Sequence, residues 1–162
     1  MGEAKSRGSF DERKHAATEV GPDTLADCYS KIFKVAQDVY KHEGGVNHDL
    51  KGVTLKDGKL AGVSVLMVED NRRVPELIQK MLSKFPVVIH TMEVWHTTKP
   101  GVIAEQDPDR EDAISFMLHT REAVMTAICP VDVKNRVVTK GELGAVVSMG
   151  GDLARSDIAT RH

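Results

Sequence analysis

Histidine is the residue type in this chain with the clearest capacity for metal or acid–base chemistry, and there are seven of them. His90 and His96 fall on one face of a predicted strand, but six residues at about 3.3 Å each separate them by about 20 Å, too far for one ion. His96 and His119 belong to neighbouring predicted strands and can approach each other. No cysteine or carboxylate accompanies them at ligand spacing. We therefore expect scattered, half-buried histidines and no metal site.

A second reading of His96 is catalytic. His96, Thr97 and Thr98 form one His-x-Thr motif, which resembles half of the signature of the two-histidine phosphoesterases. That chemistry needs two imidazoles, one acting as base and the other as acid. The second motif is broken, because the nearby triplet reads His119, Thr120, Arg121. A histidine-dependent phosphoesterase stays an alternative that the sequence supports only in part.

Two loops have compositions that suggest a bound ligand, but neither matches the corresponding binding motif in detail. An EF-hand loop that starts at Asp107 needs glycine at its sixth position and glutamate at its twelfth, where this chain has Asp112 and Leu118. We expect the acidic loop to be a solvated turn bent at Pro108. The glycines near the C-terminus form neither a P-loop nor a G-x-G-x-x-G turn, so we expect flexible loops there and no nucleotide cofactor. The acidic and glycine residues concerned are Glu105, Asp107, Asp109, Glu111, Asp112, Gly141, Gly144, Gly150 and Gly151.

Composition narrows the function classes. The chain has 162 residues, of which 41% are hydrophobic and 28% charged, as expected for one globular domain. A formal charge of -2 offers no basic field for general nucleic-acid binding. No apolar run approaches the roughly 20 residues that span a bilayer, and no signal core is visible, so a cytoplasmic protein without membrane contact is expected. Cys28 and Cys129 lie in apolar patterns and are expected to be buried free thiols.

Three regions follow from the pattern along the chain. Residues 1–20 are polar and charged and predict a flexible N-terminal arm, residues 21–150 predict a single α+β domain, and residues 151–162 predict a C-terminal tail or a short helix. Apolar residues at helical spacing after Pro22 predict a helix, with Asp23 or Thr24 as its N-cap and Gly44 at its end.

The rest of the domain reads as strands around one further helix. Asp57-Gly58 predicts a two-residue hairpin between residues 51–56 and 59–68, and the second of these strands is apolar on both faces and is expected to be central in the sheet. A helix follows through Phe85, with Pro75 in its first turn. A strand over 87–97 and a hairpin of 113–119 with 123–131 complete an antiparallel or mixed sheet of about five strands with two main helices packed on it.

Trp95 is the best candidate for binding another molecule. Each face of its strand mixes apolar and polar residues, so neither face is cleanly a core. An indole at such a boundary often anchors an interface, although packing in the monomer core explains it equally well. We assign Trp95, His96, His119 and Arg121 as the candidate binding residues.

Two segments carry a resemblance. Residues 1–8, Met-Gly-Glu-Ala-Lys-Ser-Arg-Gly, and the stretch from Glu93-Val94-Trp95 to Gln106-Asp107-Pro108-Asp109-Arg110-Glu111 resemble uncharacterised small bacteriophage or prophage accessory proteins. The resemblance covers at most a third of the chain and brings no active-site residues. It implies a phage setting, in which a small acidic accessory protein is commonly an inhibitor or a sequestering agent directed at a host system.

The absence of a recognisable reaction centre therefore predicts a protein that acts by binding. Its expected partner is a bacterial host protein, such as a defence component, or a second copy in a homo-oligomer. One alternative is the sequestering of a small anionic ligand such as a nucleotide by His96, His119 and Arg121, and the other is the phosphoesterase above.

Overall fold

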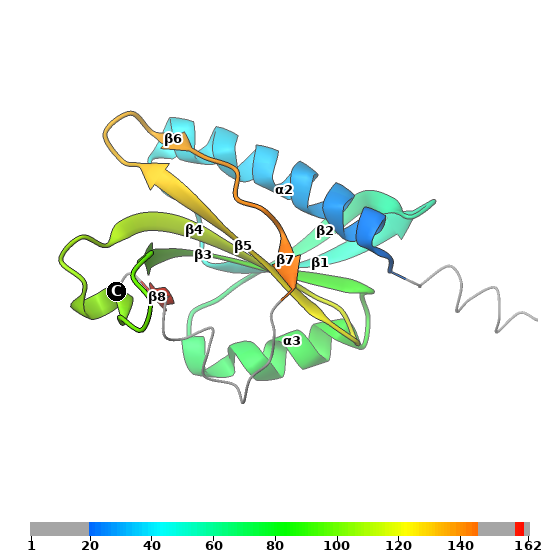
Figure 1. The fold of residues 1–162 in the computed structure, drawn as a ribbon. Coiled ribbons are helices and arrows are strands. Elements are labelled where there is room, and N and C mark those ends of the chain that lie inside the picture. The colour runs from blue at the N-terminus through cyan, green and yellow to red at the C-terminus, as the bar shows by residue number, and fades with distance from the viewer. Residues whose placement is uncertain (1–19, 146–157, 161–162) are drawn as a thin grey trace, which may run out of the picture.

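The fold is α+β, as the sequence predicted. The computed structural model describes residues 20–145 and 158–160, so the expected arm (1–20) and tail (151–162) lie almost wholly outside the described residues. The main strands run in the order β2-β1-β3-β4-β5-β6, and every pairing is antiparallel. Helix α2 covers one face of the sheet and helix α3 the other (Figure 1).

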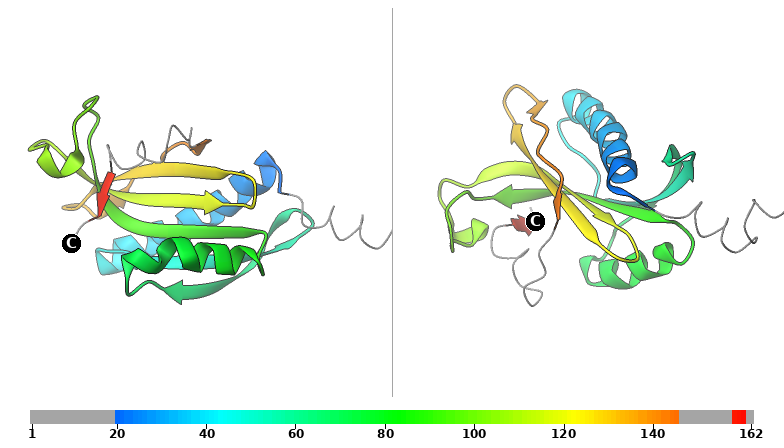
Figure 2. Two further views of the ribbon diagram at one scale, coloured as in Figure 1. Left: turned by 90° about the horizontal axis from the view of Figure 1, so that it is seen from below. Right: turned by 45° about the vertical axis from the view of Figure 1, so that its right-hand side comes forward.

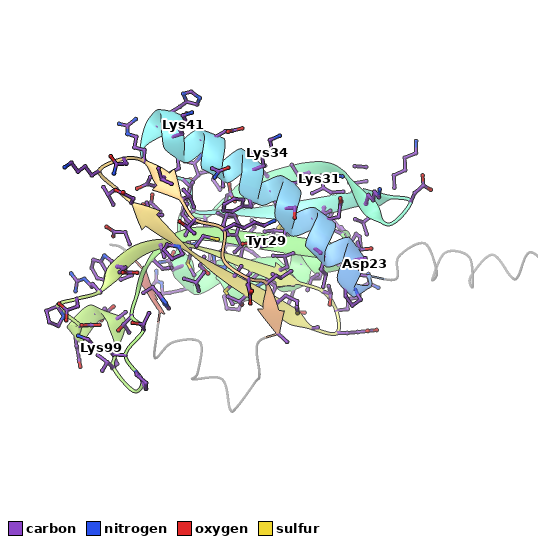
Figure 3. All side chains as sticks on the ribbon, turned by 45° about the horizontal axis from the view of Figure 1, so that its top comes forward. Asp23, Tyr29, Lys31, Lys34, Lys41 and Lys99 are labelled. Carbon is purple, nitrogen blue, oxygen red and sulfur yellow. The ribbon has the colours of Figure 1, made fainter. Side chains whose placement is uncertain are left out.

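Helix α2, Pro22–Glu43, forms because its apolar residues share one side. It begins earlier than the sequence suggested: Gly21, not Asp23 or Thr24, is the N-cap, and Pro22 supplies a preset φ in the first turn. Gly44 ends the helix in the left-handed region at φ 73°, as predicted. Tyr29 faces the sheet, whereas Lys34 and Lys41 point outward (Figure 3).

The first core lies between α2 and the sheet. The rings of Tyr29, Phe33 and Phe116 meet edge to face, with centroids 5.7 to 6.2 Å apart. Cys28 and Cys129 are both buried free thiols, as expected. The Tyr29 hydroxyl lies 3.2 Å from the Cys129 sulfur and donates to the Gly141 carbonyl at 2.6 Å, which ties α2 to the segment after β6.

Strands β1, Asp49–Lys56, and β2, Lys59–Met67, form the predicted hairpin. Asp57 and Gly58 both have positive φ, 53° and 72°, as a type I′ turn requires. The prediction that β2 is central was wrong. Strand β1 pairs with β3 on its other side, so β1 is the inner strand and β2 forms the edge of the sheet (Figure 2).

Helix α3, Val74–Leu82, follows a short 3₁₀ turn over Asn71–Arg73. The Asp70 side chain accepts a hydrogen bond from the Arg72 amide and caps this turn. The helix was predicted to run through Phe85 but ends at Leu82. Phe85 instead packs over Gly52 of β1, where an added Cβ would lie 2.4 Å from the ring. A second, smaller core of Leu50, Val74, Ile78, Leu82 and Val88 holds α3 to the sheet.

Strands β3, Val87–His96, β4, Glu111–His119, and β5, Val124–Asp132, form the centre of the sheet close to the predicted positions. The loop between β3 and β4 includes a 3₁₀ turn over Ala104–Gln106 and is not simply a solvated turn. Asp107 is only 2% exposed and accepts hydrogen bonds from the Thr97 hydroxyl and, at 2.8 Å, from the Lys99 amine. These two bonds lower the pKa of Asp107 to about 2.

Three short strands complete the sheet. Strands β6, Val137–Val138, and β7, Gly144–Ala145, both pair with β5, and β8, Ile158–Thr160, pairs with β3 where a tail or short helix was expected. Gly141 allows a close crossing and is not merely a flexible position, because an added Cβ would lie 2.0 Å from the Ile128 carbonyl oxygen. Among the residues that the structure describes, no helix combines the length and apolar content that crossing a bilayer requires.

Candidate functional site

The edge strand β2 is the most unusual surface of the described chain, because its large apolar side chains face solvent. Val63, Val65, Leu66 and Met67 are 41%, 55%, 39% and 50% exposed. An exposed edge strand presents unpaired amide and carbonyl groups that template pairing with another strand. Natural edges usually carry charges or proline to prevent such pairing, and residues 60–68 have neither.

The backbone of β2 shows which of its groups are unpaired. The Val68 amide donates to the His48 carbonyl at 3.0 Å. Hydrogen-bonded and non-hydrogen-bonded pairs alternate along an antiparallel ladder, so Leu66 and Ser64 also direct their amide and carbonyl groups toward β1. Val63, Val65 and Met67 therefore direct theirs outward from the sheet edge.

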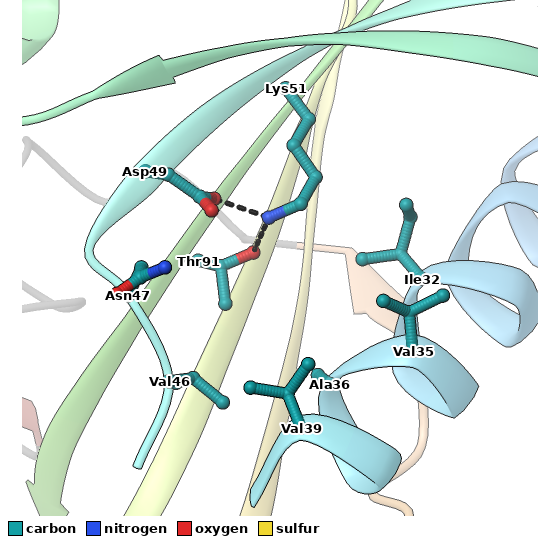
Figure 4. Close-up of a pocket in the computed structure, with 9 residues that line it drawn as sticks. All are labelled: Ile32, Val35, Ala36, Val39, Val46, Asn47, Asp49, Lys51 and Thr91. Atoms are coloured by element: carbon teal, nitrogen blue, oxygen red, sulfur yellow. Dashed lines mark hydrogen bonds and ion pairs between the residues drawn. The ribbon is translucent and has the colours of Figure 1, made fainter. Parts of the chain in front are cut away.

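A shallow cavity lies beside this edge, between α2 and the sheet. Its volume is about 100 Å³. Val65 and Met67 pair with Lys51 and Asp49 and share their face of the sheet, so the apolar side of β2 adjoins the cavity. The cavity is lined by Ile32, Val35, Ala36, Val39, Val46, Asn47, Asp49, Lys51 and Thr91 (Figure 4).

Charge in this cavity is already neutralised. Asp49 and Lys51 form an ion pair, and the lysine amine also lies 3.5 Å from the Thr91 hydroxyl (Figure 4). Only 13% of the Lys51 side chain and 9% of the Asp49 side chain are exposed. Ligand pockets for small molecules usually enclose roughly 300 Å³ or more. The cavity therefore fits one or two protruding apolar side chains better than a nucleotide.

The sequence-predicted binding residues lie at opposite ends of the sheet. Trp95 is half-buried at the end of β3, where the Arg110 guanidinium lies 3.9 Å from its ring centroid in a cation–π contact. His96 is its neighbour in sequence and points to the opposite face. The loop between β3 and β4 thus covers the indole, and the role of Trp95 in binding stays a prediction.

His96 and His119 do not approach each other within one chain. His96 pairs with Glu111 and His119 with Val88, so eight strand positions, about 26 Å, separate the two histidines along the strands. Arg121 donates from Nε to the Leu82 carbonyl at 3.2 Å, next to the end of α3. The two imidazoles that phosphoesterase chemistry requires are not brought together, and Thr97, the middle residue of the His-x-Thr motif, bonds to Asp107 instead.

The histidine pair that does form, His48 with His90, was missed by the sequence analysis. Their Nε2 atoms lie 2.7 Å apart and their rings stack with centroids at 5.0 Å. Burial, and after it the proximity of His48, lowers the pKa of His90 to about 4. The alternation of residues along β3 predicts which face of the sheet His90 lies on. His48, just before β1, meets His90 only because β1 pairs with β3, and the sequence does not reveal that pairing.

Several polar atoms on the α3 side of the sheet are buried without a hydrogen-bond partner in the part of the chain that the structure describes. They are His96 Nδ1, Ser115 Oγ, His119 Nε2 and Thr126 Oγ1. Burial also lowers the pKa of His119. Within the same described residues, no three histidine, cysteine or carboxylate side chains are grouped to hold a metal ion.

Comparison of the chain with protein-family models, curated proteins and solved structures finds no match. The function of the site is therefore inferred from its own geometry.

Proposed function

We propose that this chain is a non-catalytic binding protein that recognises another polypeptide by extending its sheet at the β2 edge. The observation that carries the proposal is the outward-facing backbone of Val63, Val65 and Met67 on a strand whose apolar side chains are about half exposed. Strand addition uses such backbone groups for affinity and side-chain pockets for specificity. The cavity under α2 supplies an apolar pocket next to this edge.

The nature of the partner follows from chemistry and from the resemblance. The Asp49–Lys51 pair leaves the cavity without a net charge, which favours an apolar strand over an anionic ligand. The likeness of residues 1–8 and 93–111 to phage accessory proteins supports a bacterial host protein, or a second copy of the chain, as the polypeptide. An inhibitor of a host defence component is the form of this function that fits a phage setting.

Edge variants test the proposal. Val65→Lys places charge in the apolar strip and is expected to weaken binding to any polypeptide, the chain itself included, by about tenfold or more. Val137 is 51% exposed on β6, at the other end of the strand order, so Val137→Lys is the matched control. Binding is measured by pull-down from bacterial lysate and by light scattering. Equal binding by wild type, Val65→Lys and Val137→Lys would refute the proposal, and loss of binding in Trp95→Ala alone would move the contact to the β3 end.

A further inference from the structure

We infer that the polypeptide that pairs with β2 is a second copy of this chain, which forms a two-fold dimer with an antiparallel β2–β2 junction. This inference rests on the proposed function, since it names the partner of the same edge. Three properties of residues 59–69 support it: the backbone pattern, the order of side-chain sizes and the positions of the charges.

The backbone pattern permits self-pairing. In an antiparallel pair of identical strands, residue i faces residue 2c − i, where c is the residue on the two-fold axis. With Ser64 on the axis, Val63 faces Val65 of the second copy, and both residues direct their amide and carbonyl groups outward. Each pair so formed joins residues of the same face, so the two sheets continue as one.

Side chains on the two sides of Ser64 differ in size, so that an antiparallel pair of β2 strands can place large side chains beside small ones. Small residues, Ala61 and Gly62, precede Ser64, and large residues, Leu66 and Met67, follow it. The two-fold axis places Gly62 against Leu66 of the second copy, and it places Ala61, the extra residue of a β-bulge in β2, near Met67. Large side chains thus meet small ones on both faces of the junction, which favours interdigitated packing.

Charges at the ends of the strand are complementary under the same symmetry. Lys59 stands at the start of β2 and Glu69 just beyond its end, and both side chains are exposed. Antiparallel pairing about Ser64 brings Lys59 of each copy close to Glu69 of the other, offset by one position because a β-bulge at Ala61 shifts the register of β2. Opposite charges at facing strand positions stabilise a pair and like charges destabilise it, so the charge pattern favours this antiparallel arrangement over a parallel one.

The junction also covers the apolar strip. Because the two-fold axis runs perpendicular to the sheet, the α2 helices of both copies lie on the same side of the continuous sheet. Val63 and Val65 of one copy then face Val65 and Val63 of the other, and Met67 lies diagonal to Val63 of the second copy, next to the cavities lined by Val35. The exposed apolar side chains of β2 lose part of their solvent contact without any rearrangement of the fold.

Cross-linking at the proposed axis tests the register. Ser64 is exposed, and in the dimer it forms a pair whose Cα atoms lie about 4.5 Å apart, within reach of a disulfide. Ser64→Cys is therefore expected to give a covalent dimer on a non-reducing gel after mild oxidation. Gly62→Cys is the control, because the register offsets its two copies by four residues, about 13 Å along the strands. Cys28 and Cys129 are buried and do not compete.

Light scattering gives a second readout that needs no introduced thiol. Wild type and Val137→Lys are expected at twice the chain mass of 17.8 kDa, and Val65→Lys at that mass itself. Circular dichroism confirms that each variant is folded. The dimer is supported when Ser64→Cys cross-links, Gly62→Cys does not, and Val65→Lys is monomeric.

The remaining outcomes separate the two proposals. A monomeric wild type whose capture of another protein depends on Val65 overturns the dimer and leaves the proposed function standing. A monomer without edge-dependent binding refutes both. A dimer that survives Val65→Lys, or a covalent dimer that forms in Gly62→Cys and not in Ser64→Cys, overturns the junction described here.

Discussion

The two carboxylates and one of the histidines in the interior of the described fold are buried with a partner. Asp107 is held by Lys99 and Thr97, Asp49 pairs with Lys51, and His90 shares a short contact with His48. A buried charge or donor without a partner costs about 1–3 kcal/mol or more, so the pairing offsets the cost of burying these side chains, whereas Ser115 and His119 are buried without such a partner. The His48–His90 pair differs from the other two because neither member supplies a fixed opposite charge.

Acid should therefore weaken the fold through His90. Its pKa is about 4 when folded and near 6.5 when unfolded, so the unfolded chain takes up a proton that the folded chain excludes. The stability that His90 contributes to the folded state is fully present above about pH 6.5 and is lost as the pH falls toward 4. On the scale of about 1.4 kcal/mol per unit, the wild type should lose on the order of 3 kcal/mol of unfolding free energy across this range. His90→Gln should show a shallower loss.

Urea titrations at pH 7, 5.5 and 4.5 measure this slope. His42→Gln provides the control, because it makes the same substitution at an exposed position near the end of α2, outside the buried pair. Part of the slope should persist in His90→Gln through His119, whose pKa is also lowered by burial. The same pH dependence in wild type and His90→Gln would contradict the role assigned to the pair.

For single residues, the sequence predicts the residue types and the face of the strand on which each side chain lies, but not which side chains contact each other. It placed His90 and His96 on one face, and that is where they lie. It could not show that His48 meets His90, or that His96 and His119 lie far apart, because both facts depend on the alignment of strands distant in the chain. The burial of Asp107 could not be predicted for a different reason. An acidic loop is expected to be solvated, and the sequence does not show that Asp107 pairs with Lys99.

Elements with strong local signals were predicted at nearly their observed bounds. Pro22 and Gly44 mark the ends of α2, and Asp57-Gly58 marks the first hairpin. The order of strands has no comparable local signal. An apolar run on both faces is typical of a central strand, but β2, which has this composition, lies at the edge of the sheet with both of its faces largely exposed.

Helix α3 should open locally before the rest of the fold. It has nine residues, of which three are buried, whereas α2 has 22 residues and eight buried side chains. A helix this short is not stable without its tertiary contacts. Amides of α3 should therefore exchange with solvent deuterium faster than those of α2. Ile78→Ala, which removes part of the small core, should cost roughly 2–5 kcal/mol and accelerate exchange in α3 most.

Hydrogen exchange followed by mass spectrometry resolves the two helices. Ile32→Ala is the matched change in the larger core, and it should accelerate exchange in α2 and its strands instead. If Ile78→Ala speeds exchange equally in both helices, α3 does not open as a separate unit, and its small core is cooperative with the rest of the molecule.

The whole molecule is an open sheet with two unlike edges. The β2 edge combines free backbone with apolar side chains, whereas β6, at the other end of the strand order, is only two residues long. A very short edge strand discourages pairing, and a nine-residue apolar one invites it. A homo-oligomer was expected from the sequence, and the strand order identifies β2 as the edge best suited to form one.

A dimer at β2 makes the thermal stability of the protein depend on its concentration. Dissociation accompanies unfolding, so by mass action each tenfold rise in concentration favours the folded dimer by about 1.4 kcal/mol. For a dimer of two chains of this size, that corresponds to a rise in Tm of about 2 °C. Calorimetry at 5, 50 and 500 µM, concentrations chosen in tenfold steps, should show this rise for wild type and Val137→Lys. Val65→Lys should unfold at one temperature throughout, and a concentration-independent Tm for wild type would mean that the β2 edge stays unpaired in solution.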